Sequence, residues 1–332
     1  VLGSPIWNGS NTNGGWLIGG GIEYGFKAHW TVKLEYDYLA LSNWNSATVP
    51  VVALGRDVQM IKAGINYKFE SGLPAEAEVA ERSKYSRDPS EDEDLQKASQ
   101  NPIADLVSVP FQSNTNFNAG PFNRTQEVLN IQPVVPMHLN ENWNVISRTI
   151  IPLISQPDPL LNSNTNGVGD ITQSLFLSPV HPGKLIWGVG PVFTAPSASD
   201  PSLGTGKVLF GPTAVLLTTP GHWVIGVLLN NQWSIGGNPL RPAVNAGLAQ
   251  PFANYNMAHG WYLNTSPIIT VNWLAASGEK WTVPVGGGVG RVFKVGDQPV
   301  NASIQAYYNA IRPTGASDWT LRTSVALLFP VK

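Results

Sequence analysis

A repeat in the turns is the feature that most constrains what this chain can fold into. Short turn sequences recur between residues 139 and 301, as LNENWNV, HPGKLIW, PGHWVIG, AHGWYLN and VGDQPVN. Their centres, Glu141, Pro182, Gly221, His259 and Asp297, follow one another at nearly equal intervals of roughly 40 residues. This regularity predicts a structural unit that repeats along the chain.

Each repeat contains two long strands. The strand segments run about 13 residues, at 223–235, 243–256, 261–273, 282–294 and 299–312. A β-propeller blade would need four short strands in one period, and strands of soluble proteins average about five or six residues. Longer connections rich in Ser, Asn, Asp and Gly alternate with the short turns, at 155–168, 197–207, 236–242, 274–281 and 313–319.

Twelve strands are predicted between 108–117 and 320–329. Their number is even and both chain ends lie on the side of the short turns, which is typical of a closed up-and-down barrel. We therefore expect an all-β fold in which residues 106–332 form a 12-stranded antiparallel transmembrane β-barrel.

The two faces of the strands indicate what surrounds this barrel. In 261–273 one face carries Leu263, Ile269 and Val271, and the other carries Asn264 and Ser266. A soluble sandwich covers its water face with Lys, Glu and Arg. Here the polar faces are built from Asn, Gln, Ser, Thr, Tyr and Gly, and only 13% of the chain is charged, against roughly 25% in soluble domains.

Aromatic residues at the strand ends give the height of the apolar band. Trp261 and Trp273 are 12 residues apart, and at ~3.3 Å per residue with a tilt near 40° they span roughly 30 Å, the thickness of a bilayer core. Trp and Tyr are enriched at such interfaces. We expect lipid outside the barrel, water or ligand inside it, and a location in the bacterial outer membrane, with the short turns toward the periplasm.

Proline conflicts with this prediction at seven positions. A closed barrel has no edge strand on which a missing N–H is harmless. Bulges would relieve the conflict, but the sequence alone does not place them. The residues are Pro133, Pro152, Pro191, Pro212, Pro251, Pro267 and Pro284.

Residues 1–69 predict three further strands, at 16–26, 30–41 and 58–69. One face of these strands carries charges of both signs, which favours a filled, salt-bridged interior. Three strands cannot close a barrel, so this segment is a partial barrel. The charged residues are Glu23, Lys33, Glu35, Asp37 and Lys62.

Residues 70–105 form a linker between the two strand regions. Residues 70–99 hold nine acidic and four basic residues, which is typical of a solvated spacer. Two short helices are predicted in it: Pro74 suits a first helical turn, Pro89 ends that stretch, and Ser90 with Glu93 has the spacing of a capping box.

Two resemblances follow from these motifs. GWLIGGGIEYGF, WTVKLEYDYLAL and INYKF in residues 1–69 resemble the last three strands of the OmpA-like eight-stranded outer-membrane barrels. Residues 100–332 resemble the outer-membrane transporter family linked to the meta-pathway of phenol degradation, through QNPIADLVSVPFQSNTNFN, NIQPVVPMHLNENWNVISRTIIPL, PGKLIWGVGPVF, GTGK and WTVPVGGGVGRVF. The second resemblance implies a transporter barrel for hydrophobic or aromatic small molecules.

Enzymatic and cofactor chemistry is not predicted. The chain has no cysteine, and its five histidines fall at predicted short turns without ligand spacing, so neither a Ser-His site on the wall nor a metal site is expected. GVGDIT and GGGVGRVF precede no helix, which argues against nucleotide binding. A net charge of −2 gives no attraction to nucleic acid. The histidines are His29, His138, His181, His222 and His259.

The predicted role is the passive or facilitated passage of small molecules through a polar lumen, with the outer-membrane bilayer and a small solute as the partners. A closed structural or adhesive barrel that acts through its outer loops is the alternative, because 12 strands lie between filled small barrels and open porins. The solute and the oligomeric state stay open. Candidate lumen residues are Arg148, Asp170 and Arg322 for the local field, and Asn230, Gln232, Asn264, Asn301, Gln305 and Tyr307 for the polar wall.

Overall fold

The computed structural model describes residues 15–27, 30–41, 57–67, 89–158 and 163–330. The chain divides into two compact units, Val1–Tyr85 and Ser86–Lys332. We describe each unit by itself.

The first unit contains a three-stranded antiparallel sheet in the order β1 (Gly15–Lys27), β2 (Trp30–Leu41) and β3 (Asp57–Tyr67). The strands start and end within a few residues of the predicted ones. In register, Glu23 lies opposite Lys33 and Glu35 lies opposite Lys62. Of the charged side chains predicted to fill an interior here, that of Lys33 is exposed, and the others lie outside the described side chains.

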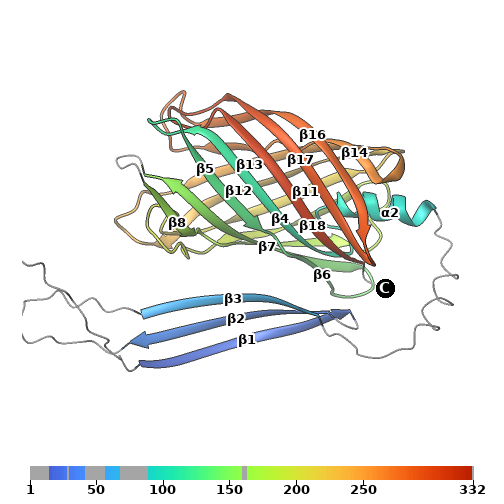
Figure 1. Cartoon of the computed structure of the whole chain (residues 1–332), viewed down its shortest axis with the longest axis horizontal. Helices are drawn as coiled ribbons and strands as arrows, with labels where there is room; N and C mark the ends of the chain where they lie inside the picture. The colour runs from blue at the N-terminus through green and yellow to red at the C-terminus, as the bar shows by residue number, and fades with distance from the viewer. Residues whose placement is uncertain (1–14, 28–29, 42–56, 68–88, 159–162, 331–332) are drawn as a thin grey trace, which may run out of the picture. The chain divides into compact units, whose positions relative to one another are not determined.

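The second unit is a closed antiparallel barrel of 12 strands, as predicted (Figure 1). Three of the 12 are each interrupted once, so that β5 and β6, β8 and β9, and β14 and β15 form single barrel strands. The barrel closes where β18 pairs with β4 along Leu106–Phe117. The strands are β4 (Leu106–Ala119), β5 (Arg124–Ile131), β6 (Val134–His138), β7 (Trp143–Pro157), β8 (Asn164–Val168), β9 (Thr172–Pro179), β10 (Ile186–Thr194), β11 (Lys207–Thr218), β12 (Trp223–Gly237), β13 (Asn245–Asn256), β14 (Trp261–Thr265), β15 (Ile269–Asn272), β16 (Trp281–Val295), β17 (Gln298–Ile311) and β18 (Trp319–Pro330).

The two ends of the barrel differ in their connections. The five predicted short turns join strands at one end, which we call the short-turn end. There the 3-10 turn η1 (Ala258–Gly260) reverses the chain with a positive φ of 59° at His259 and 75° at Gly260. The longer connections lie at the other end, the loop end. The predicted loop 155–168 is shorter than expected, because β7 continues to Pro157 and β8 begins at Asn164.

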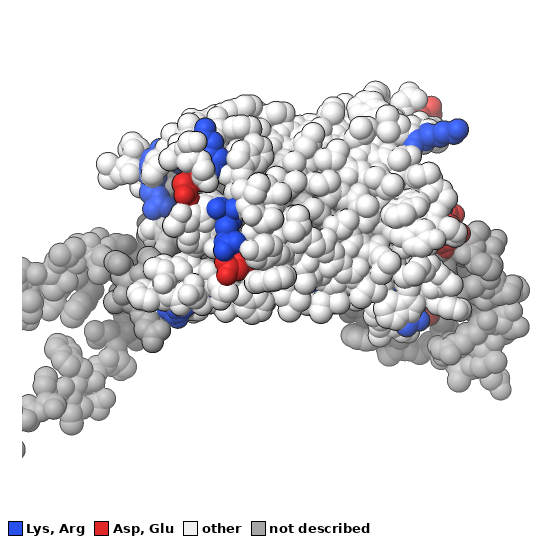
Figure 2. Space-filling view, turned by 90° about the horizontal axis from the view of Figure 1, so that it is seen from above, with Lys and Arg blue, Asp and Glu red and all other residues white. Residues whose placement is uncertain are grey.

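The outer surface has the character of a membrane-spanning wall. Figure 2 shows charged residues gathered at the two ends of the visible face, with a broad uncharged band between them. Aromatic pairs mark both borders of the wall: Trp223 packs on Tyr255 at the short-turn end, with ring centroids 4.9 Å apart, and Trp273 meets Trp281 at the loop end, 5.6 Å apart. Trp261 and Trp273 are 43% and 45% exposed, which fits interfacial anchors.

Two of the seven prolines lie at shifts in the strand register. Pro284 lies at a register shift between β16 and β17. Pro152 in β7 lies opposite the break between β8 and β9. The register between β7 and these two strands shifts by one residue there, across residues 169–171. At the other five prolines the register is unchanged. Pro133 and Pro267 interrupt a strand, and Pro191 lies opposite Pro212. Bulges therefore explain only two of the seven.

The helix α2 (Pro89–Ser99) leads into the barrel at the short-turn end (Figure 1). Pro89 begins this helix, because its fixed φ and missing N–H suit a first helical turn. The other predicted helix falls within 68–88, outside the described residues. In the described part of the chain, no helix combines the length and the apolar character needed to cross a membrane.

Residues 89–105 form what we call the plug segment. Gln96 Nε2 donates to the Trp261 carbonyl at 3.0 Å, Asn301 Nδ2 donates to Ser99 Oγ at 3.2 Å, and Gln100 Nε2 donates to Asn256 Oδ1 at 2.7 Å. The plug segment therefore packs against the barrel.

Candidate functional site: the barrel lumen

Strand register places the predicted polar wall residues toward the lumen. Asn230 lies opposite Thr213, Asn264 opposite Asn254, and Gln305 opposite Arg322. Thr213, Asn254, Gln305 and Arg322 are all nearly inaccessible to solvent, whereas outward neighbours such as Leu263 are exposed. Residues that pair with this predicted face are therefore buried, and residues of the opposite face are exposed.

Arg322, Tyr307 and Gln305 form one cluster around the interruption of the β14/β15 strand at Pro267. Arg322 Nη1 donates to the Ser266 carbonyl at 2.9 Å, and the guanidinium lies 4.9 Å from the Tyr307 ring centroid. Tyr307 Oη accepts the Ser266 N–H at 2.8 Å and donates to Gln305 Oε1 at 2.8 Å. Lumen side chains therefore satisfy backbone groups that Pro267 removes from the ladder.

Arg148 lies apart from this cluster, on the inward face of β7. Its Nη2 donates to Gln132 Oε1 at 2.6 Å. Gln132 is almost fully buried and directly precedes Pro133 at the β5/β6 interruption. No carboxylate within the described residues forms an ion pair with Arg148.

Asp170, predicted to set a local field in the lumen, lies at the loop end and binds a loop there. Its carboxylate accepts hydrogen bonds from the Thr205 N–H at 2.6 Å, the Thr205 hydroxyl at 2.8 Å and the Ala198 N–H at 3.2 Å. It thereby anchors the loop 195–206 beside the β8/β9 interruption. The bulge opposite Pro152 gives Asp170 this position, and the sequence did not place that bulge.

The remaining wall residues make separate contacts. Gln232 Oε1 accepts the Thr194 hydroxyl at 2.8 Å, and Asn301 Oδ1 accepts the Tyr262 hydroxyl at 2.6 Å. Asn264 Oδ1 is buried without a hydrogen-bond partner among the described residues.

The lumen is amphipathic, whereas a polar one was predicted. A buried apolar cluster lines the side formed by β6, β7 and β9–β13, and Ile103 of the plug segment inserts into it. The sequence contained a signal for this, since the inward face of 223–233 includes Val224 and Leu228. The contribution of Ile103 depends on a tertiary contact that no periodic pattern announces. The cluster consists of Ile103, Val134, Ile146, Phe176, Val215, Leu217, Val224, Leu228 and Phe252.

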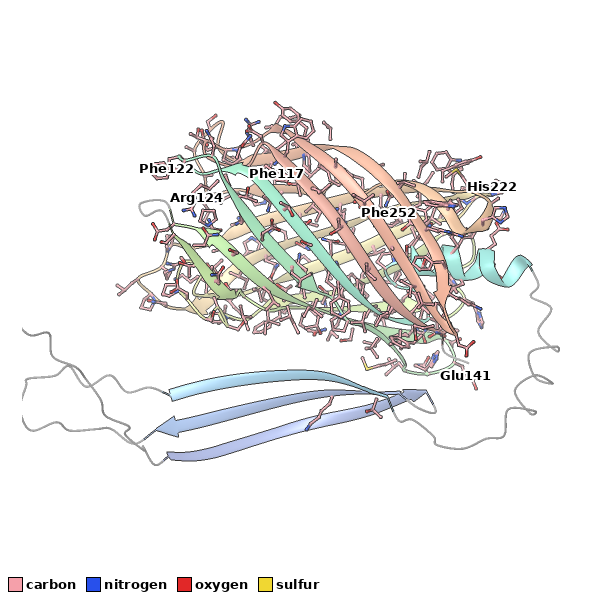
Figure 3. All side chains as sticks on the ribbon, viewed as in Figure 1. Phe117, Phe122, Arg124, Glu141, His222 and Phe252 are labelled. Carbon is pink, nitrogen blue, oxygen red and sulfur yellow. The ribbon has the colours of Figure 1, made fainter. Side chains whose placement is uncertain are left out.

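Cavities lie inside the barrel and at both of its ends. The central cavity, about 230 Å³, is bounded by the barrel wall and by residues 98–102 of the plug segment. A cavity of about 400 Å³ at the loop end is lined by Phe122 and Arg124, and one of about 810 Å³ at the short-turn end by His222 and Arg291. Figure 3 shows Phe122 and Arg124 at one end of the barrel, His222 at the other, and Phe252 between them.

Four histidines lie at the short-turn end, as predicted; His29 is outside the described residues. His138 Nδ1 lies 2.8 Å from Asn144 Oδ1, and its Nε2 lies 3.6 Å from Asp105 Oδ2. Among the described residues, no three His, Asp or Glu side chains group as metal ligands would.

Comparisons with known proteins give fold-level likenesses. No family model matches the chain. The crystal structure of an outer-membrane channel from Pseudomonas putida F1 is similar with a TM-score of 0.52 and 15% identity, over 68% of this chain and 94% of that chain. The NanC porin has a TM-score of 0.43 and 10% identity, over 67% of this chain and 98% of that chain.

A short stretch also matches characterised sequences. The chain is 38% identical over 60 residues, 18% of its length, to the 31 kDa outer-membrane immunogenic proteins of Brucella melitensis biotype 1 and Brucella suis biovar 1. The match spans 25% of the length of those relatives. The match to outer-membrane proteins, together with the closed barrel, its uncharged band and its aromatic borders, places the chain in the bacterial outer membrane.

Proposed function

We propose that the barrel carries small molecules passively across the outer membrane through its lumen, with the short turns at the periplasmic side. The observation that carries this proposal is the central cavity, which has polar and apolar walls and lies between cavities at the two ends. The likeness to a channel structure and the resemblance of residues 100–332 to the phenol meta-pathway transporter family support it. Solutes with an apolar or aromatic part suit the amphipathic wall.

No catalytic step or cofactor belongs to this proposal. The four described histidines lie at the short-turn end, away from the middle of the lumen wall. Passage would follow the concentration gradient, and the barrel would supply only a path.

Conductance of the full chain in planar bilayers and solute uptake by liposomes test the proposal. We expect discrete single-channel steps and faster uptake of small aromatic solutes than in protein-free liposomes. Absence of both would overturn it.

A closed structural or adhesive barrel is the second candidate, because the plug segment packs in the short-turn end. Ile103 is 5% exposed within the apolar cluster. A variant with a loosened plug, Ile103→Asn, separates the two candidates. If neither the wild type nor this variant conducts, the closed barrel is the better description.

A further inference from the structure

Among the described residues, the central cavity has one charged residue in its wall, and that residue is Arg148. A guanidinium has five N–H donors in a planar fork. The structure gives this one a single hydrogen-bond partner, Gln132 Oε1, within the described part of the chain. No described Asp or Glu lines the cavity, so the free donors face a space that holds no compensating charge.

An unpaired cation in such a place favours an anion. Charges interact more strongly in a water-poor interior than in bulk water, and a buried charge without a partner is unfavourable. A guanidinium binds carboxylates with two parallel hydrogen bonds, which a neutral solute cannot match.

The rest of the wall defines the shape of the ligand. Phe252, Leu228 and Val134 line the same cavity and belong to the apolar cluster. Ser108 and Gln112 line it as well and offer hydrogen-bonding groups. The cavity of about 230 Å³ is far larger than one water molecule needs and admits a small organic molecule.

We infer that this cavity is a binding site for small carboxylates with an apolar body, in which Arg148 holds the carboxylate and the Phe252 side holds the apolar part. The inference rests on the proposed passage through the lumen and narrows its substrate class. It gives Arg148 a role different from that of Arg322, whose guanidinium is already engaged by Asn114, Ser266 and Tyr307.

Binding of benzoate to the purified full chain in non-ionic detergent tests the site, with benzyl alcohol as the uncharged analogue of the same size. A ligand that binds only the folded state raises the unfolding temperature in a saturable way. We expect benzoate to do so and benzyl alcohol at equal concentration to have little effect. Arg148→Gln should weaken benzoate binding by about tenfold or more, and Arg148→Lys should weaken it less, because it keeps the charge but loses the fork.

A second variant blocks the site without removing the cation. Gln132→Glu places a carboxylate where the Gln132 Oε1 now accepts from Arg148, so the guanidinium gains an internal partner. The Gln132→Glu variant should therefore reduce benzoate binding as Arg148→Gln does. If Arg148→Gln fails to fold, Gln132→Glu still tests the site. The matched control is Arg291→Gln, which removes one cation from the outer rim, where Arg291 lies 5.2 Å from the Trp261 ring. This control should bind benzoate like the wild type.

Two results would overturn the site: equal stabilisation of the wild type and both lumen variants by benzoate, or equal stabilisation of the wild type by benzoate and benzyl alcohol. Because binding in detergent requires no conduction, the two proposals fail separately. A chain that binds benzoate through Arg148 but never conducts would remove the proposed passage alone. A chain that conducts but shows no Arg148-dependent binding would remove the carboxylate site alone.

Discussion

At the scale of single residues, Tyr307 compensates for Pro267. Its hydroxyl is the acceptor for the Ser266 N–H, and its side chain is 1% exposed. Tyr307→Phe should lower the free energy of unfolding by about 1–3 kcal/mol, because it leaves a buried donor unsatisfied. Denaturant titration in detergent measures this. Tyr308→Phe is the control, since Tyr308 points outward and keeps its ring contact with Trp319; a loss as large there would contradict the assignment.

Gly290 lies beneath the ring of Tyr262, which faces the lumen. A Cβ on Gly290 would lie 2.2 Å from Tyr262 Cζ, so Gly290→Ala must displace the ring. We expect a destabilisation of about 1–3 kcal/mol, the usual cost of overpacking. Gly236→Ala is the matched control in another strand, because the nearest atom there is 3.9 Å from the added Cβ. Unfolding curves of the two variants that coincide would disprove the close packing.

At the scale of elements, the strands are predictable from the sequence and their interruptions are not. The strand from Trp261 to Asn272 alternates well enough to reveal its inward face. Whether Pro267 causes a bulge or a break depends on Tyr307 and Arg322, which belong to β17 and β18, far along the chain from this proline. Local alternation contains no information on such distant partners. The same holds for Ile103, whose burial depends on strands that follow it.

The plug segment is the element on which the proposed passage depends most directly. If the plug segment narrows the lumen, fixing this segment to the barrel wall should lower the conductance. The chain has no cysteine, so Ser99→Cys with Asn301→Cys introduces one thiol pair, at two positions whose native side chains share a hydrogen bond. We expect lower conductance after oxidation and recovery on reduction. Either single-cysteine variant should be insensitive to both treatments, and equal conductance of the oxidised and reduced pair would show that the plug does not limit passage.

Two connections at the loop end are joined by Glu279. The Thr314 N–H donates to its carboxylate at 2.6 Å, and the Thr314 hydroxyl donates to it at 2.8 Å. These two hydrogen bonds, first the backbone one, hold the pKa of Glu279 below its ordinary value. Because the pKa is lowered on folding, the contribution to stability is present above the ordinary pKa and is lost as the pH falls through the lowered one. The amide resonance of Thr314 should therefore titrate below pH ~4.3 in micelles and become pH-independent in Glu279→Gln. A titration that persists in that variant would exclude Glu279 as its cause.

At the scale of the whole molecule, Ser86–Lys332 form a unit of their own. All 12 strand pairings of the barrel lie within it. A chain that starts at Ser86 should therefore refold in detergent with the same unfolding midpoint and the same conductance as the full chain. A clear loss of either would show that the unit Val1–Tyr85 contributes to the barrel.

Closure of the barrel has a consequence for the order of folding. The seam joins Leu106 to Pro330, so the first strand of the barrel, β4, must wait for the last one, β18. Contacts of such high sequence separation form slowly. The plug segment directly precedes β4 along the chain. It must therefore be inside before the seam closes or enter afterwards through the short-turn end, and refolding kinetics followed separately at the seam and at Ile103 would tell which event comes first.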